Sequence, residues 1–205
     1  MDEMSTTGAR RDEIRRALKL LTEWGPFTLT TILWARLTST LRRRVLTARH
    51  NLSIHRSVDI ERGVKFGYDG PVDIDAECSI GRHSVISPSG GWIHLGRNSL
   101  LNVSVTLLGN GGLDIGEDVL VGPNTTVVAA NHQFERTDEP IIAQELSAEG
   151  ITVGDNVWIG STCTVLDGIT IGDGAVVAAG SVVTESVPEN AIVAGAPAEV
   201  INIRN

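Results

Sequence analysis

Aliphatic residues recur at every sixth position between residues 151 and 183, and the residue four positions after each of them is small or β-branched. A period of six does not fit the helical period of 3.6, but it is a multiple of the two-residue period of a strand. The pattern therefore predicts a short strand and a turn, repeated as a hexapeptide parallel β-helix with one aliphatic per repeat inside. The aliphatic positions are Val153, Ile159, Val165, Ile171, Val177 and Val183, and the later positions are Val157, Cys163, Ile169, Ala175, Ser181 and Val187.

The same period extends, less regularly, through the preceding part of the chain. A small bulge at 87–94 and a long excursion at 131–150 interrupt it. Three hexads make one triangular coil, so we expect six coils and a column about 29 Å long at about 4.8 Å per coil. We therefore expect a β-helix over 51–187 and a C-terminal tail over 188–205. The earlier inward positions are Ile54, Ile60, Phe66, Ile74, Ile80, Ile86, Leu95, Leu101, Leu107, Ile115, Val121 and Val127.

Residues 1–50 follow a helical pattern instead. Apolar positions predict amphipathic helices over 9–24 and 29–48, and the intervening Gly25-Pro26 ends the first of them. The open end of a repeat column needs covering, so we interpret this segment as an N-terminal α-helical cap on an otherwise all-β fold. Its basic face supports an alternative interpretation, which is contact with an anionic membrane surface.

The charge of the chain is divided between these two parts. Residues 1–50 hold ten Lys/Arg and five Asp/Glu, and the remainder holds seven and twenty. An acidic body argues against nucleic acid as the main partner. The acidic, polar N-terminus does not resemble a signal peptide, and the longest apolar run is too short to span a bilayer. We therefore expect a cytoplasmic protein, with peripheral contact at the inner membrane as the alternative.

The excursion at 131–150 is the first candidate for chemistry. Loops of this length inside a compact repeat are uncommon and usually functional. It opens with His132, directly after a predicted strand, so the imidazole is anchored on the scaffold. A histidine can take a proton from a hydroxyl near neutral pH, as acyl transfer from a thioester requires. A solvated surface histidine is the alternative interpretation.

The motif NHQFERTDEPI in this excursion resembles the loop motif of hexapeptide-repeat acyltransferases. The stretch 101–200 is similar to their galactoside, maltose and bacterial polysaccharide O-acetyltransferase branch. That resemblance implies a left-handed β-helix. It also implies that His132 is the catalytic base and that Asn102 holds the acceptor sugar. Without the resemblance, Asn102 is equally a corner residue that tolerates a left-handed backbone.

The motif NVWIGS is similar to the segment that flanks the acetyl-CoA tunnel in that family. The resemblance implies that Trp158 lines the acceptor and tunnel region and that the Ser161 N–H lies near the thioester oxygen. An aromatic that fills a subunit interface is the alternative interpretation of Trp158. Family members run the pantetheine arm towards an A-G-x-P turn, past positions that here are Ala178, Ala179, Gly180, Thr184, Ala194, Gly195 and Pro197.

One departure concerns the phosphates of coenzyme A. The family often has basic residues where this chain has Glu185 and Glu199, and Arg204 is the only cation nearby in sequence. The resemblance therefore implies acetyl-CoA as co-substrate, with Arg204 as the candidate phosphate contact. A basic residue of an adjacent subunit is the alternative.

With this resemblance, the sequence implies an acetyl-CoA-dependent O-acetyltransferase of a sugar hydroxyl, with direct transfer and His132 as general base. The resemblance implies a homotrimer with active sites between neighbouring columns. The alternatives are N-acetylation of an amino sugar, acetylation of an antibiotic or of serine, and a non-catalytic hexapeptide scaffold. We expect no metal, because a zinc site needs three converging imidazoles and only His50 and His55 have a spacing that resembles the zinc-binding carbonic anhydrases of this fold.

Overall fold

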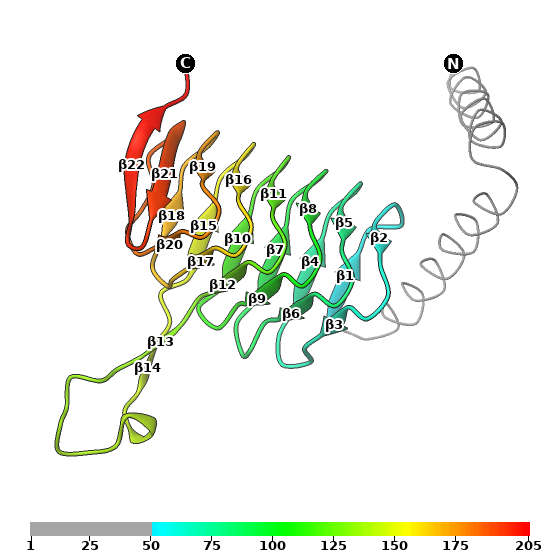
Figure 1. Cartoon of the computed structure of the whole chain (residues 1–205). Coiled ribbons are helices and arrows are strands. Elements are labelled where there is room, and N and C mark those ends of the chain that lie inside the picture. The colour runs from blue at the N-terminus through cyan, green and yellow to red at the C-terminus, as the bar shows by residue number, and fades with distance from the viewer. Residues whose placement is uncertain (1–50) are drawn as a thin grey trace, which may run out of the picture. The chain divides into compact units, whose positions relative to one another are not determined.

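The computed structural model describes residues 51–205, so the predicted helical cap and its membrane-contact alternative lie outside the described residues. Within this part the chain winds through three parallel sheets in turn, and each coil contributes one strand to each sheet (Figure 1). The strands are only two or three residues long as far as β20 because each occupies one side of a narrow triangle.

Sheet A contains β1 (Leu52–Ile54), β4 (Val72–Ile74), β7 (Ile93–Leu95), β10 (Leu113–Ile115), β15 (Ile151–Val153) and β18 (Thr170–Ile171). Sheet B contains β2 (Asp59–Ile60), β5 (Ser79–Ile80), β8 (Leu100–Leu101), β11 (Leu120–Val121), β16 (Trp158–Ile159), β19 (Val176–Val177), β21 (Ala191–Gly195) and β22 (Ala198–Ile203). Sheet C contains β3 (Lys65–Phe66), β6 (Val85–Ser87), β9 (Thr106–Leu108), β12 (Thr126–Val128), β17 (Thr164–Val165) and β20 (Val182–Val183). The excursion holds β13 (Asn131–His132), the 3₁₀ helix η1 (Ile141–Ala143) and β14 (Leu146–Ser147).

The interior of the column is a single aliphatic core. Every predicted inward position is buried except Ile54 in the first described strand, which is half-buried. The positions four residues later in the last two coils, from Val157 to Val187, are buried as well. The period-six prediction of an interior column is therefore confirmed.

The corners between strands form three edges along the column. We call them the AB, BC and CA edges after the sheets that each corner connects in chain order. The third residue of most AB and BC corners has a positive φ, which Gly, Asn and Asp adopt at least cost. Successive corners are joined by backbone hydrogen bonds, for example from the Gly180 N–H to the Ser161 carbonyl over 2.8 Å. The edges are therefore as regular as the sheets.

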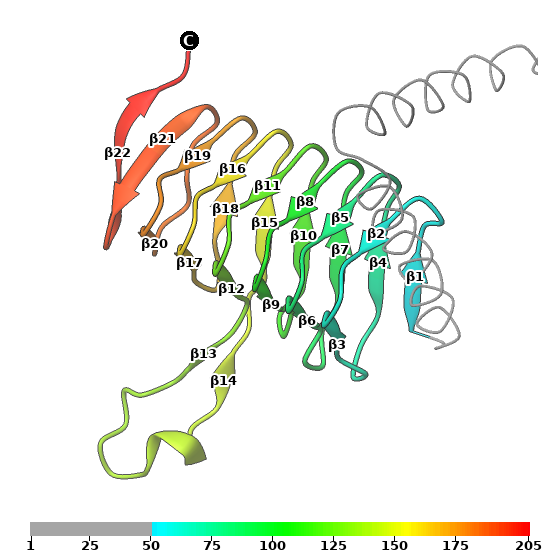
Figure 2. The ribbon, with the colours of Figure 1, turned by 45° about the vertical axis from the view of Figure 1, so that its right-hand side comes forward.

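The C-terminal end departs from the pure repeat. Strand β21 continues sheet B in parallel with β19, and β22 folds back antiparallel along β21. The six predicted coils are confirmed, and β21 adds a partial seventh layer. The residues expected as a tail therefore form a hairpin at the end of the column (Figure 2).

Candidate functional site

His132 lies at the base of an arm, defined here as residues 131–147, that projects from the CA edge (Figures 1 and 2). Strands β13 and β14 pair antiparallel, with His132 opposite Leu146. The Gln133 N–H extends the ladder to the Glu145 carbonyl over 3.0 Å. The imidazole is exposed, and a two-stranded ladder fixes the backbone that carries it.

An open hollow of about 540 Å³ surrounds this histidine. Its lining includes Phe134 and Glu135 from the arm and Leu166 from the next coil. Of the arm carboxylates, Glu135 alone lines the hollow, and Asp138 and Glu139 pair with Arg136. The hydrogen bond from Arg136 lowers the pKa of Asp138, so that carboxylate is held as an anion away from the histidine.

The BC edge brings together three of the other predicted site residues. Asn102, Ser161 and Ala179 follow strands β8, β16 and β19 of sheet B, so they lie in one line along the column. The Asn102 side chain oxygen accepts a hydrogen bond from the Val103 N–H over 2.8 Å, which leaves its amide NH₂ free to donate. Within the described residues, the N–H groups of Ser161 and Ala179 donate no hydrogen bond.

Trp158 lies on the outer face of sheet B, in the strand that leads into the corner of Ser161. Its side chain is 55% exposed and lies between Leu120 and Val176 in the ladder. The outward positions Leu100 and Ile192 extend this ladder. In contrast, the matching positions of sheet A include Asp73, His94 and Asp114. From its third layer onward, sheet B therefore presents an apolar outer face, which we call the apolar ladder (Leu100, Leu120, Trp158, Val176 and Ile192).

The remaining candidates for coenzyme A contacts lie at different edges. Pro197 lies in the β21–β22 turn, where Gly195 donates its N–H to the Ser181 hydroxyl at the end of the BC edge. Thr184 follows β20 and so begins the CA edge. The Arg204 guanidinium donates to the Gly174 carbonyl at the AB edge. The structure therefore groups Pro197 with Ala179 and separates Arg204 from both.

A single chain does not bring His132 together with Asn102. Sheet C lies between the BC edge, which holds Asn102 and Ser161, and the CA edge, which holds His132. Crossing a side of the triangle takes about six residues at about 3.3 Å each, far beyond hydrogen-bond reach. A site that contains both residues must therefore draw them from two chains.

Sequence reasoning missed the residue that anchors the arm. The Asp167 carboxylate accepts hydrogen bonds from the N–H groups of Glu149 and Gly150, at 2.9 Å each to its nearer oxygen. It therefore fixes the point where the chain returns to the column. In the sequence, this residue could have been found only as an acidic residue at the CA corner of the coil that follows the excursion.

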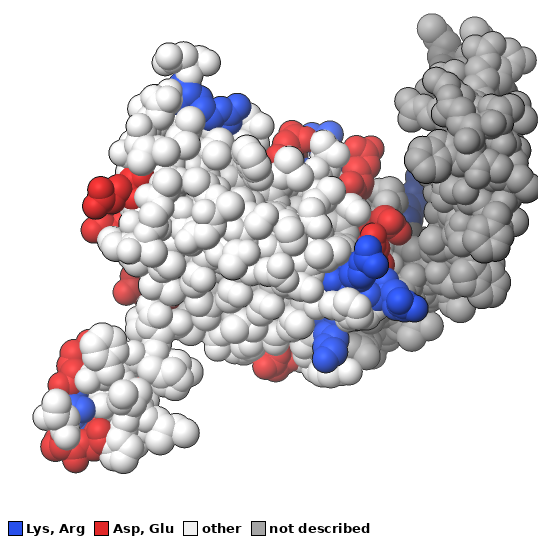
Figure 3. All heavy atoms as spheres, viewed as in Figure 1, with Lys and Arg blue, Asp and Glu red and all other residues white. Residues whose placement is uncertain are grey.

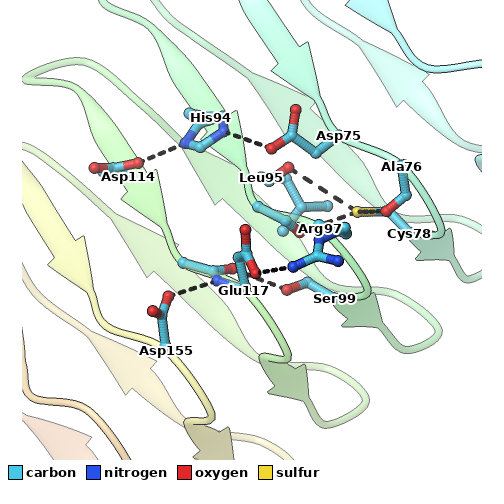
Figure 4. Close-up of polar contacts among 12 residues, drawn as sticks. Asp75, Ala76, Cys78, His94, Leu95, Arg97, Ser99, Asp114, Glu117 and Asp155 are labelled. Atoms are coloured by element: carbon cyan, nitrogen blue, oxygen red, sulfur yellow. Dashed lines mark hydrogen bonds and ion pairs between the residues drawn. The ribbon is translucent and has the colours of Figure 1, made fainter.

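The other histidines of the described part are not among the predicted site residues. His55 and His83 are exposed at corners, and the His94 imidazole lies between Asp75 and Asp114 on sheet A (Figure 4). No group of three or more His, Cys, Asp or Glu in residues 51–205 is placed to hold a metal ion. No helix in the same range is long and apolar enough to cross a membrane.

Comparison with known proteins gives the repeat its family. The model for bacterial transferase hexapeptide (six repeats) matches residues 150–185. Galactoside O-acetyltransferase of Escherichia coli (strain K12) is 37% identical over 129 residues, which cover 60% of this chain and 63% of that protein. Residues 150–185 of this chain therefore carry a bacterial transferase hexapeptide repeat, and the chain is similar to sugar O-acetyltransferases that share it. A putative lipopolysaccharide biosynthesis O-acetyl transferase, WbbJ of the same strain, is 33% identical over 122 residues, covering 56% of this hexapeptide-repeat chain and 62% of its own.

Solved structures extend the likeness to the whole hexapeptide-repeat fold. A galactoside acetyltransferase in complex with coenzyme A superposes with a TM-score of 0.57 at 25% identity, covering 100% of this chain and 86% of that one. A mutant of AntD, an N-acyltransferase from Bacillus cereus in complex with dTDP and coenzyme A, gives 0.70 at 21% identity, covering 80% and 88%. The second likeness shows the fold alone. The chain spans less than two thirds of each of the two curated relatives, galactoside O-acetyltransferase and WbbJ.

Proposed function

We propose that this protein is an acetyl-CoA-dependent O-acetyltransferase that acts on a sugar hydroxyl. The observation that carries the proposal is the placement of His132 on a hairpin base beside an open hollow, in a chain 37% identical over 129 residues to a galactoside O-acetyltransferase. That relative's name supplies the acceptor class, and a structural neighbour contains coenzyme A. Because acetyl-CoA is a cytoplasmic metabolite, we further propose that the protein works in the cytoplasm.

The proposed reaction is direct transfer. His132 takes the proton of the acceptor hydroxyl, the hydroxyl oxygen attacks the thioester carbonyl carbon, and the carbon–sulfur bond breaks. The sulfur of coenzyme A leaves and is protonated, and His132 returns to its neutral form. The Ser161 N–H, which has no partner within the described residues, would stabilise the negative oxygen of the intermediate. No serine or cysteine nucleophile is needed in this route.

The free backbone donors of the BC edge fit the proposed co-substrate. Pantetheine carries amide and thioester carbonyls in line, and Ser161 and Ala179 offer N–H donors on successive coils of one edge. The corner also has no room for a side chain at Gly122, where a Cβ would lie 2.6 Å from the Ser161 nitrogen. We therefore assign the late coils of the BC edge, with Pro197 at their end, to acetyl-CoA. Thr184 begins the CA edge, so it would contact a co-substrate bound along the BC edge of a neighbouring chain.

We propose that the protein is a homotrimer of left-handed columns. Sheet C separates His132 from Asn102 within one chain, and packing around a threefold axis would place the CA edge of one chain beside the BC edge of its neighbour. Two exposed apolar surfaces also need a partner. They are the apolar ladder of sheet B and the arm tip, where Ile142 is 87% exposed. In such a trimer, a basic residue of the adjacent chain can replace Arg204 at the phosphates.

The test combines two substitutions. Release of free coenzyme A thiol, with a panel of sugars and amino sugars as acceptors, should fall roughly 10²–10⁴-fold in His132→Ala and stay unchanged in the exposed control His55→Ala. If sites are shared, mixed trimers of His132→Ala and Asn102→Ala chains should recover activity at about a quarter of their interfaces. A rate in His132→Ala within a few-fold of the parent rate contradicts the mechanism. Failure of mixed trimers to recover activity contradicts the shared site.

A further inference from the structure

A cluster of cations lies over the first coils of the column, although the described part of the chain is strongly acidic. Residues 51–205 hold seven Lys/Arg and twenty Asp/Glu. Three of those seven cations, Arg62, Lys65 and Arg82, occur at or next to two successive BC corners. Figure 3 shows Lys and Arg side chains gathered over this end of the column, away from the acidic arm. We call these three residues the basic cluster.

The basic cluster lies on the same edge as Asn102, in direct continuation of it. The His83 N–H donates to the Arg62 carbonyl over 3.3 Å, and the Ser104 N–H donates to the Arg82 carbonyl over 2.9 Å. These bonds stack the corners of the first three coils on one another. Because layers of a sheet are about 4.8 Å apart, the backbone of Arg82 lies one layer from Asn102 and that of Arg62 two layers away.

Most of this positive charge is not neutralised within the described residues. The Arg82 Nε lies 3.7 Å from the Glu61 carboxylate, which is a long contact between two exposed groups. The same carboxylate oxygen accepts the Arg82 backbone N–H over 3.0 Å. Arg62 and Lys65 form no ion pair with any described residue. Arg97 and Arg136 behave differently, since Arg97 pairs with Glu117 at 2.6 Å and Arg136 pairs with Asp138 at 2.9 Å, whereas Arg56 at the first AB corner forms no ion pair among the described residues either.

The proposed course of coenzyme A, along the late coils of this edge and on to Pro197, leads away from the basic cluster. The free donors Ser161 and Ala179 lie on the fifth and sixth layers of sheet B, and the cations lie on the first two. Asn102, on the third layer, lies between them. A hydroxyl held at Asn102 therefore has the thioester on one side and the guanidinium groups on the other. The cations face the far end of the acceptor.

We propose that the acceptor sugar carries an anionic group, a phosphate or a carboxylate, that binds to Arg82 and Arg62 while its hydroxyl is held at Asn102. This inference rests on the proposed function for the role of Asn102, and it narrows the acceptor to a negatively charged sugar. A sugar ring spans about one layer spacing, so a substituent on it reaches the next corner. Guanidinium groups bind such oxyanions through paired N–H donors, and Lys65 adds a point charge.

The experiment measures anion binding and transfer separately on the full chain. Binding of glucose 1-phosphate, glucuronate and glucose is followed by calorimetry, and each compound is then tried as an acetyl acceptor. Both anions should bind more tightly than glucose, with affinity that falls as salt rises. Arg82→Gln and Arg62→Gln should weaken anion binding roughly tenfold or more and leave glucose binding unchanged. If only one anion shows this pattern, it identifies the group as phosphate or carboxylate.

Arg97→Gln is the matched control. Arg97 lies at an AB corner with a side chain 58% exposed, compared with 61% for Arg82, and its loss should leave anion binding unchanged. Equal binding of the anions and glucose, or equal sensitivity to Arg97→Gln, overturns the anionic acceptor. Transfer by the parent chain to neutral sugars that is as fast as transfer to the anionic sugars also overturns it and leaves the proposed function standing. Binding that depends on Arg82, without transfer to any acceptor by the parent chain or any effect of His132→Ala, contradicts the proposed function instead.

Discussion

The column and the arm are built on opposite principles. In each coil, three short strands direct one aliphatic side chain apiece into a shared core. The arm, residues 131–147, buries no side chain at all. Its shape depends on local polar bonds, such as those by which the Gln144 side chain donates to the Arg136 carbonyl at 2.8 Å and accepts its N–H at 3.2 Å.

This difference assigns stability to the column and the candidate chemistry to the arm. Each buried aliphatic contributes about 1.5–3 kcal/mol, so the column holds the free energy of folding. The arm carries His132 and contributes little burial, so it can vary without cost to the fold. We therefore expect substitutions in the column to change stability and substitutions in the arm to change activity.

The largest expected effect on stability comes from truncating an aliphatic side chain in the core of the column. Ile171 is fully buried, and Ile171→Ala should lower the free energy of unfolding by about 2–5 kcal/mol, because the cavity cannot collapse between two fixed layers. The matched change Ile142→Ala in the arm should alter it by less than about 0.5 kcal/mol. Denaturant unfolding measures both. Equal losses would show that the arm packs against something that contributes to stability.

Shortening the arm should lower the activity and leave the stability unchanged. Replacing 134–144 by an Asn-Gly turn keeps β13 and β14 and removes Phe134, Glu135 and η1. Acetyl transfer should fall at least about tenfold, because the hollow at His132 loses one wall. The melting temperature should remain that of the parent chain. A stable variant with the parent rate would show that the arm does not shape the site.

The interior of this fold was predictable from sequence, and the edges were only partly so. The period of six identifies inward residues because burial acts on each hexad alone. Contacts between coils depend on the number of residues per coil, which varies in the early coils. Strand β1 pairs with β4 at Leu52↔Val72, and β4 pairs with β7 at Val72↔Ile93, so the offset changes from one layer to the next.

The candidate site shows the same limit. The resemblance proposes His132 and Asn102 as site residues from local motifs, but neither motif specifies an edge of the triangle. Their separation by sheet C follows from the order of strands in the coils. The convergence of Arg62 and Arg82 on one edge and the anchoring of the arm by Asp167 also arise between coils. Such placements depend on which corners stack on one another, and the six-residue period does not record this stacking.

Among the described non-glycine residues with a positive φ, Thr162 is the one β-branched residue, and replacing it tests how much strain that corner stores. Thr162 has a φ of 58° at the BC corner beside Ser161. A β-branched residue is strained at a positive φ. The BC corner of the preceding coil instead has Asn124 at this position, with a φ of 59°. Thr162→Asn should therefore raise the free energy of unfolding by about 1 kcal/mol. Thr126→Asn, on a strand of sheet C, is the control and should not stabilise. A loss of stability in Thr162→Asn would mean that the threonine makes a contact that offsets the strain.

The smallest expected effect comes from a titrating group on the outer wall of the column. Partial burial lowers the pKa of His94, but hydrogen bonds and charges from Asp114, 2.7 Å from its Nδ1, and from Asp75 outweigh it, so the pKa is raised above 6.5. A raised pKa means that His94 stabilises the folded state below pH 6.5 and that this contribution disappears as the pH rises through the folded-state pKa. The stability difference between the parent and His94→Gln should therefore be larger at about pH 5 than at about pH 8. In an NMR titration, Asp114→Asn should move the His94 pKa down. A parent His94 that titrates below 6.5 would show that desolvation outweighs both carboxylates even on this half-exposed wall.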